Sequence, residues 1–331
     1  MKKSTTVVLA AATMLAGTAL TTLPAQADLV TRCSGTAGAV TVPGDLVVPR
    51  DTSCTLNGTV VEGDVRVRPD ADLIGTGVSV TGQVIGADAA YVELVESEVD
   101  GQVRLTGSYG GVLDASAVAE RVLVRAAEGG DDGSDPFVYA TEADLGGNVV
   151  LRTGEHVISS STVAGSILSQ GATYTDVYDT FIDRRLEITD SAEGSMVCAV
   201  VVQRDSHIST SAGLVQLGAD GPAADCTAGT SYWGGDVTVQ GSTGGVVVDD
   251  VIVNGSLHLT ENDPTAQVGE STRVRDEIEG PFVPLEAQVP IARSLTPQTA
   301  ADRTAEVQER ISERRASATQ RAAAAGSADI G

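Results

Sequence analysis

The sequence predicts an all-β fold, a single-stranded parallel β-helix with about 19 residues per turn and about 11 turns. Three observations lead to this prediction. A short motif returns about every 19 residues, aliphatic residues flank it with a period of two, and two pairs of cysteines fit the same spacing. Residues 1–27, 28–270, 271–296 and 297–331 are expected to form a signal peptide, the β-helix, a Pro-rich linker or cap, and a helical or disordered tail.

The N-terminus has the features of a Sec-type secretory signal. Lys2 and Lys3 precede an apolar run from Val7 to Leu20, and Ala25-Gln26-Ala27 matches a cleavage site after Ala27. The run is short and rich in Ala and Thr, so we do not expect it to span a bilayer. No second apolar stretch follows, which predicts no integral membrane segment and a location outside the cell or at its surface.

The expected mature chain is strongly acidic. Cleavage would remove both lysines and no acidic residue, which leaves 19 arginines against 45 acidic residues and a formal charge of −26. Such a charge disfavours non-specific binding to nucleic acid or anionic lipid. It is compatible with a basic partner or a cation.

The repeat is clearest at Gly44, Gly63, Gly82 and Gly101, each 19 residues after the last. We call these positions anchors. The later anchors are Glu120, Gly147, Gly165, Arg184, Arg204, Gly235 and Gly255. Two longer intervals indicate insertions, at residues 128–141 and about 218–232.

The residue two positions before the anchor is apolar in every repeat. These residues are Val42, Val61, Val80, Val99, Val118, Leu145, Val163, Ile182, Val202, Trp233 and Val253. The positions two and four after the anchor are mostly apolar, and the position between them is polar, as expected for a strand with one buried face. Strands that recur in one register cannot pair through hairpins, so we expect each turn to stack in parallel on the last. A β-sandwich would not keep this register.

The Val-x-Gly-x-Val-x-Val repeat, as in Val61 to Val67, resembles that of secreted right-handed β-helix proteins of the pectin-lyase-like class. It also resembles the short repeats of bactofilins. The resemblance covers roughly residues 40–267 and implies the fold rather than an activity. A right-handed coil is expected, because the turn length and the insertions suit it and the six-residue period usual in left-handed helices is missing.

The four cysteines match the predicted register. Cys33 and Cys54 are 21 residues apart, close to one turn, and should lie within disulfide reach on neighbouring turns. Cys198 and Cys226 flank the second insertion and are expected to pair there. An exported chain favours disulfides over the alternative of buried free thiols.

The tail differs in composition from the repeats. Residues 271–296 contain three prolines, and an Ala/Arg/Glu-rich stretch begins near Pro297. Ala300, Val307, Ile311 and Ala318 form a thin apolar stripe at helical spacing. The segment is expected to be a marginal helix, with a partner or oligomerisation helix as the alternative.

The closest match to a polysaccharide-cleaving site surrounds two consecutive anchors. It consists of Asp183, Arg184, Arg185, Arg204 and Asp205. Acids and arginine on one outer face are implied by the resemblance to β-helical lyases and hydrolases, which makes Asp183, Arg185 and Asp205 candidate catalytic residues. The simpler interpretation is an ion pair between Arg185 and Asp205 on adjacent turns.

Two other pairs have spacings that invite a functional interpretation. Asp45 and Asp64 are column neighbours, as paired-carboxylate catalysis requires, but the repeat alone explains them. His207 and His258 share a column two turns apart, too far to bind one metal ion. The histidines are therefore expected to be exposed surface imidazoles.

Two weaker candidates remain. Asp131, Asp132 and Asp135 lie in an insertion with a central glycine, and either bind Ca²⁺ or form a solvated acidic loop. Tyr174 and Tyr178 are candidate ligand contacts, whereas Trp233 is expected in the core.

These features favour a non-enzymatic secreted or cell-surface rod that acts as a structural, adhesive or assembly element without a cofactor. Its expected partner is a cell-wall or extracellular polysaccharide, or another copy of the chain. A carbohydrate-active enzyme and a Ca²⁺-dependent adhesin are the alternatives.

Overall fold

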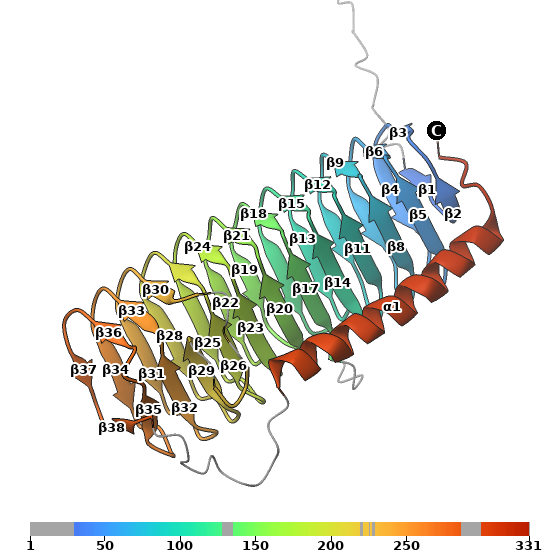
Figure 1. Ribbon diagram of the computed structural model, residues 1–331. Coiled ribbons are helices and arrows are strands. Elements are labelled where there is room, and N and C mark those ends of the chain that lie inside the picture. Colours follow the sequence, from blue (N-terminus) through green and yellow to red (C-terminus); the bar gives the residue numbers. More distant parts are fainter. Residues whose placement is uncertain are drawn as a thin grey trace, which may run out of the picture.

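The computed structural model describes residues 30–127, 135–218, 221–224, 226, 229–285 and 299–330. Their strands stack into three parallel sheets, A, B and C, that run the length of a rod (Figure 1). Each turn of chain contributes one strand to each sheet in the order A, B, C. The fold is therefore the predicted parallel β-solenoid.

Sheet A has 13 described strands. They are β1 (Val30–Arg32), β4 (Asp45–Val48), β7 (Val65–Val67), β10 (Val84–Gly86), β13 (Val103–Thr106), β16 (Val122–Arg125), β19 (Val149–Leu151), β22 (Ile167–Gln170), β25 (Leu186–Thr189), β28 (Ser206–Ser209), β31 (Val237–Gln240), β34 (Leu257–Thr260) and β37 (Ile278–Glu279).

Sheet B also has 13 described strands. They are β2 (Gly35–Ala37), β5 (Ser53–Asn57), β8 (Asp72–Thr76), β11 (Tyr91–Val95), β14 (Gly110–Asp114), β17 (Phe137–Thr141), β20 (Glu155–Ser159), β23 (Tyr174–Tyr178), β26 (Ser195–Cys198), β29 (Val215–Gly218), β32 (Val246–Asp249), β35 (Ala266–Val268) and β38 (Phe282–Pro284).

Sheet C has 12 described strands, most of them two residues long. They are β3 (Thr41–Val42), β6 (Val60–Val61), β9 (Ser79–Val80), β12 (Glu98–Val99), β15 (Ala117–Val118), β18 (Asp144–Leu145), β21 (Thr162–Val163), β24 (Phe181–Ile182), β27 (Val201–Val202), β30 (Ser231–Trp233), β33 (Val251–Val253) and β36 (Arg273–Val274).

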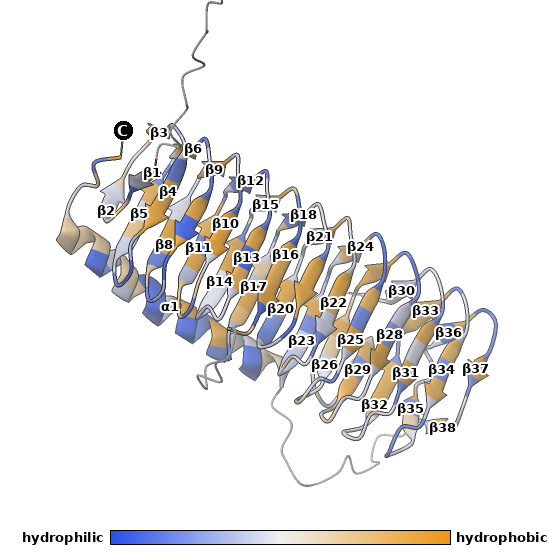
Figure 2. Cartoon of the chain, turned by 180° about the vertical axis from the view of Figure 1, so that it is seen from behind, coloured by the Kyte–Doolittle hydropathy of each residue, from blue (hydrophilic) through white to orange (hydrophobic). Residues whose placement is uncertain are grey.

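The stacking register is the one the repeat predicted. Val61 pairs with Val80, and Val80 with Val99, and all three side chains are buried. Similar aliphatic columns run along the inside of each sheet and form one continuous core. Figure 2 shows hydrophobic residues following one another from strand to strand along the rod.

The rod has about 13 turns, two more than predicted. The additional turns lie at the ends, at β1 and at β37. In the last turn Asp276 occupies the anchor position and Gly280 an aliphatic position, so the motif is lost although the stacking continues. Three strands, β36 to β38, therefore lie beyond residue 270, where the visible repeat ends.

Close approach of the backbone explains the glycine anchors. At Gly82 an added Cβ would lie 2.6 Å from the carbonyl oxygen of Gly63, and at Gly101 it would lie 2.6 Å from that of Gly82. The Gly101 amide also donates a hydrogen bond of 3.0 Å to the Gly82 carbonyl. Successive turns approach so closely at this corner that an added side chain would collide with the neighbouring turn.

Both expected disulfides are present. One joins Cys33, just after β1, to Cys54 in β5, and the other joins Cys198 in β26 to Cys226 in the second insertion. No cysteine is free. Two disulfides fit an extracellular protein.

Helix α1 (Ala300–Ala325) runs along the outside of sheet B, from β23 to β2 (Figure 1). Its 26 residues span about 39 Å, enough to cross eight strands. It begins with a capping box between Thr299 and Asp302. The predicted apolar stripe faces the sheet, and Val307 and Ala318 are fully buried. Among the described residues, no helix combines the length and apolar character needed to cross a bilayer.

Four acidic residues on the outer face of sheet B form ion pairs with arginines of α1. Asp176 pairs with Arg303 at 3.2 Å, and Glu155 with Arg310 at 2.9 Å. Further along the helix, Arg315 pairs with Glu93, and Arg314 and Arg321 both pair with Asp72. The helix is thus fastened to sheet B by charge along most of its length.

The chain beyond α1 covers the N-terminal end of the rod. Ser327 forms a parallel bridge with Thr36 of β2. The Thr36 amide donates to the Gly326 carbonyl at 2.9 Å, and the Ala328 amide donates to the Thr36 carbonyl at 2.8 Å. Ile330 is buried against the end of the core. The residues after α1 therefore cap the N-terminal end of the solenoid.

Candidate functional site

Two consecutive turns place arginine where the stacking favours glycine. Arg184 lies between β24 and β25, and Arg204 lies between β27 and β28. Both keep the backbone contacts of an anchor: the Arg184 amide donates to Gly165 at 3.2 Å, and the Arg204 amide donates to Arg184 at 3.1 Å. Glu120 and Asp276 are the other exceptions to glycine among the described anchors. The stacking of the turns does not require a large side chain at this position. Binding of a ligand would explain the two arginines.

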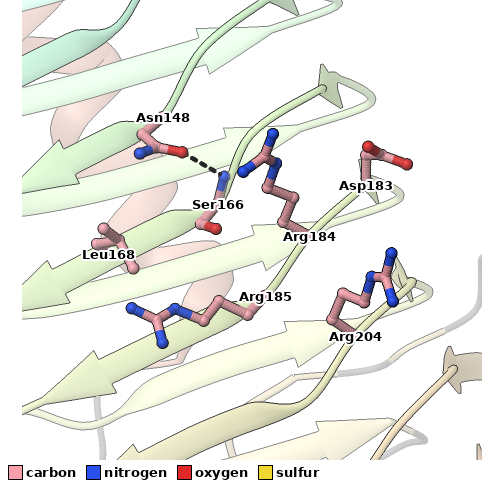
Figure 3. Close-up of a pocket in the computed structure, with 7 residues that line it drawn as sticks. All are labelled: Asn148, Ser166, Leu168, Asp183, Arg184, Arg185 and Arg204. Carbon is pink, nitrogen blue, oxygen red and sulfur yellow. Dashed lines mark hydrogen bonds between the residues drawn. The ribbon is translucent and has the colours of Figure 1, made fainter.

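The two arginines border a shallow groove on the outside of the rod (Figure 3). Its volume is about 480 Å³, in the range of small-molecule sites. The lining residues are Asn148, Ser166, Leu168, Asp183, Arg184, Arg185 and Arg204. Figure 3 shows the three arginine side chains spread around the groove rather than converging on one point. The sequence analysis had grouped Asp183 and the three arginines. It did not include Asn148, Ser166 and Leu168, which come from earlier turns.

The groove has an excess of positive charge. Arg185 pairs with Glu187 on its own strand at 3.2 Å. Its expected partner on the next turn, Asp205, does not form an ion pair with it in the structure. Among the described residues neither Arg184 nor Arg204 has an ion pair, so the groove can accept an anionic group.

Asp205 has a contact that recurs along the rod. Its Oδ1 accepts a hydrogen bond of 3.1 Å from the amide of Asp236, its neighbour in the next turn. Asp45 accepts from the Asp64 amide at 2.9 Å in the same way, and Asp64 accepts from Gln83 at 3.1 Å. The paired carboxylates seen in the sequence thus hold successive turns together.

A second, smaller groove of about 280 Å³ adjoins the first and shares Arg185 and Arg204 with it. His207 and His258 both line it, and Thr238 separates them in the column, as the two-turn spacing predicted. His258 Nδ1 lies 2.8 Å from Glu279 Oε2.

His156 is buried, so the expectation of an exposed imidazole is wrong for this residue. It occupies an inward column of sheet B between Val138 and Thr175. Its Nε2 lies 2.8 Å from the Thr153 carbonyl oxygen, and burial lowers its pKa to about 4. The turn from Gly147 to Gly165 has 18 residues, and the shift of one position turns this side chain inward.

The tyrosines proposed as ligand contacts lie against α1. Tyr174 is only 3% exposed, and the Arg303 guanidinium lies 4.6 Å from its ring centroid. Tyr178 is half-buried beside the start of the helix. Neither presents an open ring to solvent. Trp233 is buried in the core, as predicted.

Of the acidic loop, Asp131 and Asp132 lie outside the described residues. Asp135 accepts a hydrogen bond of 2.8 Å from the Thr173 hydroxyl. In the part of the chain that the structure describes, no group of three or more His, Cys, Asp or Glu side chains is placed to hold a metal ion.

The fold and the groove define a parallel β-solenoid with a helix strapped along one sheet and an arginine-lined groove beside another. No family model matches the chain, and neither a curated protein nor a solved structure matches it.

Proposed function

We propose that this protein is a non-enzymatic, secreted or cell-surface rod that acts as an adhesive element and binds an anionic ligand in the arginine groove. The observation that supports this most directly is the replacement of the anchor glycine by Arg184 and Arg204 on consecutive turns. In a chain of net charge −24, a general attraction for anions is ruled out, so any anionic ligand needs a local concentration of arginine. Guanidinium groups suit carboxylate and sulfate, because their donors form a planar fork.

The state of the nearby carboxylates favours binding over catalysis. Asp183 is the one carboxylate that lines the first groove. In the second groove, Asp205 and Asp236 hold neighbouring turns together, and Glu187 pairs with Arg185. Hydrolysis of a glycoside by paired carboxylates needs two that are available on either side of the bond.

The test replaces both arginines by the glycine of the repeat. Arg184→Gly/Arg204→Gly should change the free energy of unfolding by less than about 1 kcal/mol, because the backbone already follows the anchor path. Binding to immobilised sulfated and carboxylated polysaccharides should fall by at least about tenfold, and neutral dextran should not bind. Arg50→Gln is the control, since Arg50 is exposed and its one ion pair among the described residues is with Asp70.

Equal binding by the variant and the natural sequence, or no binding of any polyanion, would reject the proposal. A rise in reducing ends during incubation would instead support the enzyme alternative. Repeating the measurement with EDTA tests the Ca²⁺-dependent adhesin, for which binding would disappear.

A further inference from the structure

Arginine is distributed unevenly over the three sheets. The described strands of sheet B contain none and those of sheet C contain only Arg273. Sheet A strands carry Arg32, Arg66, Arg104 and Arg125, and others directly adjoin sheet A strands, namely Arg68, Arg121, Arg152 and Arg185. Most of the remaining described arginines lie on α1 and are used to fasten it to sheet B. Outside α1, most of the described arginines therefore lie on or directly beside sheet A.

Five consecutive strands of sheet A, β10 to β22, present no acidic side chain on their outer face. The outward residues are Gln83, Ile85, Ala87, Gln102, Arg104, Thr106, Arg121, Leu123, Arg125, Asn148, Val150, Arg152, Ser166, Leu168 and Gln170. We call this set the arginine panel. All but Ser166 are at least partly exposed. The chain has 45 acidic residues, yet none of them is on the outer face of these five strands. The panel is therefore a distinct surface.

Hydrogen bonds between turns hold three of the four arginines of the panel in place, namely Arg121, Arg125 and Arg152. Arg121 Nε donates to Gln102 Oε1 at 2.8 Å, and Gln102 in turn donates to Gln83 at 2.9 Å. Arg125 Nε donates to the Thr106 hydroxyl at 3.1 Å. The outer nitrogens of Arg121 and Arg125 have no partner among the described residues. Such fixed, partly unsatisfied donors lose little entropy when a ligand binds.

The panel and the groove are continuous. Asn148, Ser166 and Leu168 belong to both. From β10 to β28, at the end of the groove, the surface spans about 29 Å along the rod at the usual spacing of strands. A ligand that crosses the strands along the rod axis would contact both.

We propose that the arginine panel and the groove form one extended site for a linear acidic polysaccharide lying along sheet A. This rests on the proposed function and names the ligand class. The arginines suit carboxylate or sulfate groups, and the amides Gln83, Gln102, Asn148 and Gln170 suit hydroxyl groups. Between these polar columns lie the aliphatic side chains of Ile85, Leu123, Val150 and Leu168, with Arg104 between the first two. These aliphatic side chains suit the C–H face of a sugar ring. The panel has no aromatic ring on which a nucleobase would stack, which favours a polysaccharide over a single-stranded nucleic acid.

The experiment compares a short and a long ligand on two variants of the full chain. The panel variant is Arg104→Gln/Arg121→Gln/Arg125→Gln, the groove variant is Arg184→Gly/Arg204→Gly, and the control is Arg50→Gln. Each is titrated with a disaccharide and with its parent polymer, in a sulfated and a carboxylated series that identify the preferred charged group. We expect the polymer to bind more tightly than the disaccharide. The panel variant should lose at least about tenfold in affinity for the polymer and less than about twofold for the disaccharide.

Three outcomes would overturn the extended site. The first is that the panel variant binds the polymer as tightly as the natural sequence while the groove variant binds it more weakly. This outcome would leave the proposed function intact. The second is equal affinity for disaccharide and polymer. The third is single-stranded DNA binding as tightly as the polysaccharide of equal charge. If no anionic ligand binds and the groove variant behaves like the natural sequence, the proposed function itself fails.

Discussion

The ion pair between Asp176 and Arg303 gives a sharp test of how α1 is held. Asp176 is fully buried in β23, where it accepts hydrogen bonds from the Arg303 guanidinium at 3.2 Å and from the Met196 amide at 2.9 Å. Replacing Arg303 by glutamine leaves a buried carboxylate without a counter-charge. Breaking a buried pair in this way costs about 3–5 kcal/mol. We therefore expect Arg303→Gln to reduce the free energy of unfolding by that amount at pH 7. If the start of α1 detaches first, the free energy of that local opening should fall instead.

The loss should depend on pH. Burial already raises the pKa of Asp176 in the natural protein, and without Arg303 the pKa should rise further. A carboxyl whose pKa is raised in the folded state favours folding only when protonated, so its stabilising contribution is lost as pH rises. The difference between Arg303→Gln and the natural sequence should therefore be smallest at acid pH and largest near neutrality.

A double-mutant cycle completes the test. Arg303→Gln/Asp176→Asn removes both charges and should be more stable than Arg303→Gln alone, by at least about 1 kcal/mol. Denaturant unfolding measures stability, and limited proteolysis within α1 reports local release. Arg50→Gln, at an exposed pair with Asp70, should cost no more than about 1 kcal/mol. If the single and double variants unfold alike at pH 7, the buried pair does not hold the helix.

Three other predictions concern the core, the stacking and the cap. Lowering the pH from 7 to 4 should cost about 3 kcal/mol through His156, because its pKa is about 4 when folded and about 6.5 when unfolded, so the unfolded chain binds the proton first. Urea unfolding of His156→Val should lack this slope. Gly101→Ala should destabilise the fold by about 1–3 kcal/mol, since its Cβ would lie 2.6 Å from the Gly82 carbonyl oxygen, whereas Gly38→Ala, with open space around it, should change the melting temperature little. Deleting Gly326–Ile330 exposes the edge of β2 and should produce larger species in light scattering; an unchanged monomer with the same stability would contradict the role of the cap.

Regularity explains why the sequence predicted so much of the fold. Parallel stacking repeats one environment in each turn, so Val61, Val80 and Val99 reveal the register without further information. The prediction stopped where the motif degenerates, at turns such as that of Asp276. It also missed His156, because a turn one residue shorter reverses which side chains face inward.

The outer face of sheet B was less predictable for a different reason. Its residues contact α1, so their types depend on the facing helix residues rather than on the 19-residue repeat. Tyr174 was therefore interpreted as a ligand contact, although it packs beneath Arg303. On sheet A the candidate arginines were recognised because Arg184, Arg185 and Arg204 lie with two aspartates around consecutive anchors, as in a polysaccharide-cleaving site. The rest of the groove was not, since Asn148 and Ser166 belong to other turns and only the folded chain brings them together.

The long contact between α1 and sheet B changes how the rod would come apart. A solenoid in which each turn touches only its neighbours frays from its ends, one turn at a time. Here the first turn is joined through the C-terminal cap to a helix that is anchored as far away as Asp176. A force applied to the two ends of the rod would load these contacts in shear, all at once, instead of peeling off single coils. Such a fastening would suit a molecule that has to resist tension.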